Sequence, residues 1–150
     1  VEVDRQWLLG GPAENVMSTG VGAKTGGLQT STLAVGLASG AIEFLEAESA
    51  KRDDLVLAME ALKQEHAELR DQLIQAAAGE IECSNEQVRT SANSLVLRAT
   101  QASLAAAKGA GFVTGHPAGR WCREALFFMV WSCPQPVMNA HLCQLAGIAE

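Results

Sequence analysis

An unbroken apolar stripe between residues 55 and 73 constrains the fold of this chain more than any other feature. Its spacing alternates between four and three residues, which places every member on one face of an α-helix, with charged residues opposite. Such a helix is stable in water mainly when other helices cover its apolar face. The stripe therefore predicts packed helices, and it consists of Leu55, Met59, Leu62, His66, Leu69 and Leu73. We expect His66 to be a core or edge histidine with a hydrogen-bond partner.

Capping and helix-breaking residues divide the rest of the chain into further helices. Ser84 and Gln87 form a capping box, in which each side chain satisfies a backbone N–H group of the other residue. Pro117 suits a first helical turn, and Pro134 and Pro136 end that helix. The predicted helices cover about 28–52, 55–79, 84–109 and 117–133, followed by a short one at 137–145.

These elements predict an all-α fold: an antiparallel four-helix bundle with a short C-terminal helix. Before it we expect an irregular segment with a short strand at Val1–Leu9, because Gly10-Gly11-Pro12 is a strong turn signal. In the first long helix, Gly36 and Gly40 lower helix propensity by about 1 kcal/mol each, so we expect close helix contacts there. Coiled-coil assembly is the alternative fold, but only the second helix keeps a strict heptad seam.

Charge and hydropathy exclude several classes of partner. The net charge of −6 argues against nucleic acid, whose phosphates need clustered Lys and Arg. The absence of an apolar run of 18 residues or of a leader argues against a membrane span, so a cytoplasmic location is expected. Residues 84–149 hold five basic and two acidic side chains, against six and fourteen in residues 1–83. The more basic region could serve an anionic ligand.

Cysteine and histidine residues gather near the C-terminus without the spacing of a zinc site. Structural zinc sites usually pair ligands two to four residues apart. Only His141 and Cys143 are that close, and a separation of two places them on different helix faces. We therefore expect buried, inert thiols and no metal, although five candidate ligands fall within 28 residues: His116, Cys122, Cys133, His141 and Cys143.

The run Lys108-Gly109-Ala110-Gly111-Phe112, followed by Pro117 and Arg123-Glu124-Ala125, resembles the acyl-CoA dehydrogenase family. There a Gly-Gly-x-Gly-Phe/Tyr turn leads to a proline and to Arg-Asp-Ala. The first long helix also resembles the family's Ala-x-Gly-x-Ala pattern, and Val1–Gly10 resembles the end of its β-domain. The resemblance spans residues 1–150. It implies a segment, 1–26, leading in from a preceding β-domain, and a C-terminal helical bundle at 27–150.

The resemblance also implies a function. In the family this bundle packs against FAD, a glutamate removes the α-proton of an acyl-CoA thioester, and the flavin takes a hydride. It implies a homo-oligomer, a dimer or tetramer, and FAD bound only together with the domains that would complete the site. Gly109 and Gly111 match the family's glycine turn, and Arg120 and Arg123 could hold a phosphate or carboxylate of the substrate.

Several family features are replaced. The glutamate position is Ser132, which cannot act as a comparable base, and His116 is the nearest titratable candidate in sequence. Lys108 stands at the first glycine, Ala105 at a glutamine, and the loop between the first two helices is shortened to 51–54. Two classes stay open: a flavin-dependent oxidoreductase acting on CH–CH groups, and a non-catalytic assembly or ligand-binding domain. We expect the aromatic residues of 121–131 to pack in the core or in an interface.

Overall fold

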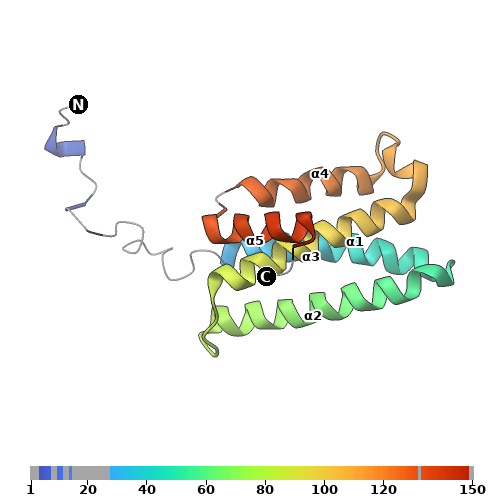
Figure 1. The fold of residues 1–150 in the computed structure, drawn as a ribbon, viewed down its shortest axis with the longest axis horizontal. Helices are drawn as coiled ribbons and strands as arrows, with labels where there is room; N and C mark the ends of the chain where they lie inside the picture. The colour runs from blue at the N-terminus through green and yellow to red at the C-terminus, as the bar shows by residue number, and fades with distance from the viewer. Residues whose placement is uncertain (1–3, 8–9, 12–13, 15–27, 132, 149–150) are drawn as a thin grey trace.

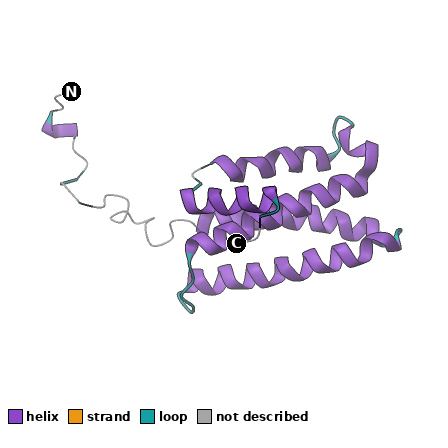
Figure 2. Ribbon diagram, in the orientation of Figure 1, coloured by secondary structure: helices purple, strands orange, loops and turns teal. Residues whose placement is uncertain are grey.

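The all-α fold is confirmed. A computed structural model describes residues 4–7, 10–11, 14, 28–131 and 133–148, and within these ranges it contains five α-helices and no strand. The four long helices run antiparallel to their sequence neighbours, and α5 packs on α3 (Figures 1 and 2). The helices are α1 (Leu28–Ser49), α2 (Val56–Ala78), α3 (Asn85–Ala107), α4 (Pro117–Val130) and α5 (Gln135–Ala146). None of the described helices is both long and apolar enough to cross a membrane.

The helix α3 is the centre of the bundle, because it packs against each of the other four helices. Its inner face carries mostly small side chains that allow close approach. The Ser103 hydroxyl donates to the carbonyl oxygen of Ala41 in α1 at 2.6 Å, which shows how near the two backbones come. The core that these contacts create includes Val88, Ala92, Leu95, Val96 and Ala99 of α3 and Ala34, Ala38, Ala41, Ile42 and Leu45 of α1.

The predicted stripe on α2 is confirmed as the buried face of that helix. Met59, Leu62, Leu69 and Leu73 are buried, and His66 is half-buried at the edge. Half of the predicted capping box is present, since the Ser84 hydroxyl accepts from the N–H of Gln87 at 3.3 Å. Gly79 ends α2 in the left-handed conformation with φ of 75°. These caps fix where α2 stops and α3 begins.

The apolar residues of α1 are not all on its buried face. Ala41 and Leu45 are buried, whereas Leu33 is 65 % exposed. The buried face also includes Ser31, Ala34 and Ala38, because their small side chains let α1 lie against α3. Close packing thus sets the orientation of α1, and it leaves Leu33 beside the contact.

The glycines of α1 provide a test of helix propensity. The prediction of a close helix contact at Gly36 is wrong, since a Cβ atom there would meet nothing within 4 Å. A Cβ on Gly40 would only touch Trp121 at 3.9 Å. We therefore expect Gly36→Ala to raise the free energy of unfolding by about 0.5–1 kcal/mol in urea denaturation. Gly79→Ala, at a positive φ, should lower it; equal effects of the two changes would contradict this account.

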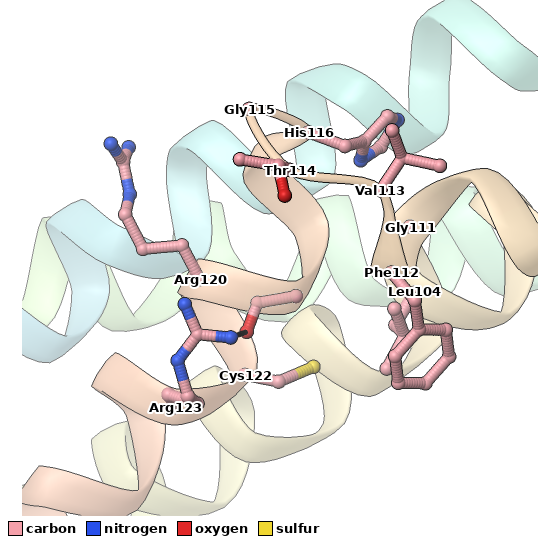
Figure 3. A pocket seen from close by; sticks show the side chains of 11 residues that line it. Leu104, Gly111, Phe112, Val113, Thr114, Gly115, His116, Arg120, Cys122 and Arg123 are labelled. Carbon is pink, nitrogen blue, oxygen red and sulfur yellow. Dashed lines mark hydrogen bonds between the residues drawn. The ribbon is translucent and has the colours of Figure 1, made fainter.

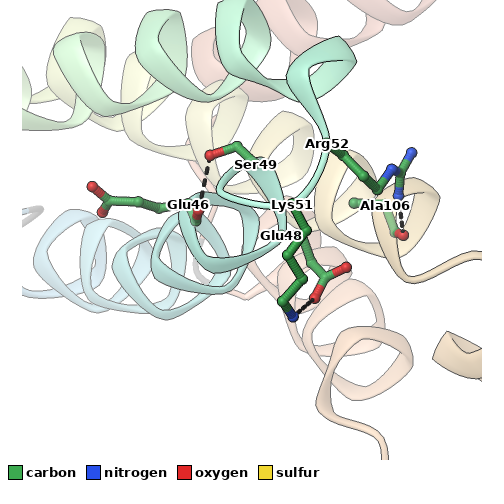
Figure 4. Close-up of polar contacts among 6 residues, drawn as sticks. All are labelled: Glu46, Glu48, Ser49, Lys51, Arg52 and Ala106. Atoms are coloured by element: carbon green, nitrogen blue, oxygen red, sulfur yellow. Dashed lines mark hydrogen bonds and ion pairs between the residues drawn. The ribbon is translucent and has the colours of Figure 1, made fainter.

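The turn between α1 and α2 is hydrogen-bonded to the C-terminal end of α3 (Figure 4). Arg52 donates through Nη1 to the carbonyl oxygen of Ala106 at 2.8 Å. A cation at a helix C-terminus is favourable because the last carbonyl groups lack partners within the helix. The Ser49 hydroxyl donates to the carbonyl of Glu46 at 2.8 Å, and Lys51 pairs with Glu48 at 3.0 Å. The loop at 51–54 is therefore an ordered connection.

The strand expected at the N-terminus is not formed by the described residues of that segment. Arg5–Trp7 form a short 3-10 helix, η1. The Asp4 carboxylate accepts from the N–H of Gln6 at 3.2 Å, and the Asp4 carbonyl accepts from that of Trp7 at 3.0 Å. Asp4 therefore starts a turn where the apolar pattern predicted an extended chain. Residues 1–3 and 8–9 of the predicted strand lie outside the described residues.

Candidate functional site

The glycine-rich turn brings the end of α3 and the start of α4 into backbone contact. It forms a short 3-10 helix, η5 (Lys108–Phe112), in which Gly111 is buried. A Cβ on Gly111 would lie 2.6 Å from Cδ1 of Leu104. On α4, a Cβ on Gly119 would lie 2.6 Å from the carbonyl oxygen of Gly111. Gly111 and Gly119 thus allow the end of α3 and the start of α4 to approach closely. Gly119 is not part of the sequence motif.

Lys108 stands where the resembled family has its first glycine, and its backbone conformation is one that favours glycine. Its φ is 54° and its ψ is −144°, and among described residues other than glycine no other has a positive φ. This region of conformational space is nearly restricted to glycine and costs about 1–3 kcal/mol for other residues. The turn has therefore the backbone of a glycine-containing motif at a position occupied by lysine.

This strain gives a second testable prediction. We expect Lys108→Gly to raise the free energy of unfolding by about 1 kcal/mol, because relief of the strained conformation outweighs the greater freedom of the unfolded chain. Lys108→Ala keeps a Cβ and should gain nothing, so it is the matched control. Equal stability of the two variants in urea denaturation would show that Lys108 is not strained.

A cavity of ≈ 510 Å³ opens between the turn and the first turns of α4. Figure 3 shows Arg120 and Arg123 extending from α4 on one side of it and Phe112 on the other. The cavity lies at the N-terminus of α4, where backbone N–H groups favour a negatively charged ligand. Besides Leu104 and the glycines, its lining consists of Phe112, Val113, Thr114, His116, Arg120, Cys122 and Arg123.

The two arginines of the cavity keep donors available. Arg120 pairs with Glu124 through Nε at 3.3 Å, and its side chain is 62 % exposed. Arg123 donates through Nη1 to the carbonyl oxygen of Gly119 at 2.9 Å. A guanidinium group has five N–H donors, so each arginine can still bind a phosphate or carboxylate oxygen.

His116 caps α4, and this position limits what its ring can do. Its Nδ1 accepts from the backbone N–H of Ala118 at 3.2 Å, and the ring packs edge-on against Phe44 at 5.5 Å. A neutral imidazole has a single acceptor nitrogen. When Nδ1 is that acceptor, Nε2 carries the proton and can donate, but it cannot take a proton from a substrate. The geometry thus favours a capping role over that of a base.

Cys122 is the only cysteine among the cavity-lining residues that the structure describes, and it is held as a thiol. Its Sγ donates to the carbonyl oxygen of Thr100 at 3.2 Å. Burial raises the pKa of the Cys122 thiol, although a hydrogen bond with the Thr100 side chain and the charge of Arg123 act in the opposite direction. A protonated thiol is a weak nucleophile, so Cys122 lines the cavity without supplying a nucleophile to it.

The remaining predicted residues are placed differently. A Cβ on Gly109 would meet nothing within 4 Å, so this glycine faces open space. Ser132 lies outside the described residues, and nothing tests its role. Trp121 packs against Phe44 at 6.1 Å and Phe128 is buried. Phe127 and Trp131 stack at 5.1 Å on the outside of α4. The aromatic residues of α4 therefore divide between the core and an exposed face.

Sequence reasoning missed a polar cluster at the other end of α4. Arg89 is 3 % exposed; its Nε donates to Asn93 at 3.0 Å, and its Nη2 to the carbonyl oxygens of Phe128 at 3.3 Å and Trp131 at 3.0 Å. Burial lowers the pKa of Arg89 from its usual value. Asn93 also donates to Phe128 at 3.0 Å. No sequence signal marks Arg89, since arginine is ordinarily exposed.

Comparison with known proteins identifies no relative: no family model, no curated protein and no solved structure matches this chain.

Proposed function

We propose that this chain is the helical ligand-binding and assembly domain of a flavin-dependent oxidoreductase of the acyl-CoA dehydrogenase type. In this proposal the cavity at the start of α4 binds the phosphate-bearing part of FAD or of an acyl-CoA thioester. The observation that carries the proposal is the cavity itself, because the turn that resembles the family motif forms one wall and two arginines form another.

The charge and shape of the cavity suit a nucleotide phosphate. Arg120 and Arg123 supply cationic donors, and the N-terminus of α4 adds the positive end of a helix dipole. These residues fit an anionic cofactor fragment; FAD, when bound, would supply the redox chemistry, and this domain would supply binding and orientation.

The backbone of the turn supports the same proposal. Lys108 adopts a conformation suited to glycine at the position where the family carries one. A lysine in this conformation is understandable if the turn descends from a glycine-containing one and its shape is retained. This support is independent of the arginines, since it rests on a dihedral angle and not on charge.

A non-catalytic ligand-binding domain is the second candidate, and His116 favours it. Removal of an α-proton needs a base within hydrogen-bond reach. The acceptor nitrogen of His116 is occupied by the cap of α4, and Glu124 is paired with Arg120. The base would then have to lie outside the residues that line the cavity.

An exposed apolar face on α4 supports the assembly part of the proposal. Leu126, Phe127, Val130 and Trp131 form this face, and they are 55 %, 44 %, 78 % and 57 % exposed. Adjacent exposed aromatic and aliphatic side chains are typical of protein interfaces. We propose that a second copy covers them in a homodimer or a larger homo-oligomer.

The oligomer gives a third prediction. We expect light scattering to report at least a dimer, and Val130→Asp to shift it to a monomer, because a charge in the centre of an apolar interface is left unpaired. Leu57→Asp is the matched control, since Leu57 is 82 % exposed on α2 and lies outside this face. A clean monomer at high concentration would contradict the proposal.

The function is tested on the native gene product. We expect it to purify with a flavin absorption spectrum, and an acyl-CoA thioester to bleach that spectrum if the protein is a dehydrogenase. A bound flavin that no thioester reduces would favour the non-catalytic candidate. Absence of any flavin after purification and after incubation with FAD would overturn the FAD part of the proposal.

A further inference from the structure

The attachment of α5 to the bundle depends on few buried side chains. Of its twelve residues, Val137 and His141 are buried. Beside Val137, a cavity of ≈ 370 Å³ separates α5 from the first turns of α3, and it is lined mainly by polar residues such as Ser84, Thr90 and Ser91. A helix held by two side chains beside a polar cavity can open locally at low cost compared with the rest of the fold.

His141 is an unusual anchor, because it is buried without a full set of partners. It is 3 % exposed, and its Nε2 has no hydrogen-bond partner. Its side chain does bond with that of Gln144 on the same helix. A buried polar atom without a partner is rare and calls for a physical explanation. The neutral ring tolerates the site, since an unprotonated nitrogen costs far less to bury than a charge.

The charges around His141 disfavour its protonated form. The charge of Arg89 on α3 acts against protonation of His141, and within the described residues Arg89 makes no ion pair with a carboxylate. Glu86 lines the cavity between α3 and α5, whereas His141 is not among the residues that line it. Cys133, between α4 and α5, interacts electrostatically with Arg89. A proton on His141 would therefore place a second buried positive charge next to the first.

We propose that α5 is a proton-sensitive latch, docked on α3 while His141 is neutral and released when His141 is protonated. Release would uncover Val137 and the side of α3 that carries Arg89. This inference rests on the buried cluster and not on the proposed function, so either can fail without the other.

The direction of the pH effect follows from linkage. Burial lowers the pKa of His141, and Arg89 lowers it further, whereas the bond with Gln144 raises it. With the folded pKa below the value near 6.5 of an undocked histidine, the docked state binds fewer protons. Docking is therefore strongest above pH 6.5 and weakens as the pH falls toward the lowered pKa.

The test is hydrogen exchange of residues 135–146 followed by mass spectrometry at pH 7.5 and pH 5.0, corrected for intrinsic exchange rates. We expect protection to fall about tenfold at pH 5.0 in the wild type and to be independent of pH in His141→Gln. His66→Gln, which alters a half-buried histidine on α2, should behave as the wild type.

Two results would overturn the latch: unchanged protection of the wild type between the two pH values, or the same pH dependence in His141→Gln. If His141→Gln is undocked even at pH 7.5, an NMR titration of His141 in the wild type decides the matter. The latch requires α5 to lose protection over the pH range in which His141 takes up its proton; titration of His141 with α5 still protected would refute it.

Discussion

Arg89→Ala is expected to lower the free energy of unfolding by about 3 kcal/mol. Arg89 donates to Asn93 and to the carbonyl oxygens of Phe128 and Trp131, so truncation removes two buried hydrogen bonds and one part-buried one, although Asn93 still donates to Phe128. Each unsatisfied buried polar group costs about 1–3 kcal/mol, partly offset because a buried cation is also removed. Urea denaturation followed by circular dichroism measures the change.

The matched control is Arg98→Ala on the same helix. Arg98 is exposed and pairs with Glu65 across the surface, where an ion pair contributes at most about 1 kcal/mol. We expect Arg98→Ala to change the free energy of unfolding by less than that. Similar values for the two variants would mean that Arg89 does not hold the end of α4.

Gly119→Ala should have an effect of similar size. A Cβ at this position would lie 2.6 Å from the backbone oxygen of Gly111, which no side-chain rotation can relieve. The start of α4 must then move away from η5, and overpacking of this kind costs about 1–3 kcal/mol. Gly109→Ala, in the adjoining turn, is the control, because its Cβ would meet nothing within 4 Å. If both variants shifted the thermal unfolding midpoint equally, the close approach of α4 to η5 at Gly119 would be contradicted.

The sequence predicted the fold where one face of a helix is strongly apolar. The stripe of α2, the cap at Ser84 and the prolines around α4 were sufficient for the number and order of the helices. Prediction was weaker in α1, because a large side chain such as Leu33 dominates an apolar pattern. Close packing instead selected the small residues Ala34 and Ala38 for the contact.

The candidate site was predicted only in part. Its turn and arginines follow from the motif, whereas the need for Gly119 arises from contact between two chain segments and leaves no local pattern. The burial of Arg89 and His141 was not predicted, for a related reason. Their burial depends on contacts among α3, the end of α4 and α5. From the sequence alone, a polar residue within a helix is expected to be exposed, because these tertiary contacts leave no local pattern.

The central claim, that the cavity at the start of α4 binds a phosphate-bearing ligand, is tested most directly by calorimetric titration of the native protein with FAD and with coenzyme A. We predict stoichiometric binding of at least one of them, weakened about tenfold or more in the Arg120→Gln/Arg123→Gln double variant. Arg70→Gln, on the exposed face of α2, should bind as the wild type does. No binding of either ligand, or equal affinity in the wild type and the double variant, would contradict the claim.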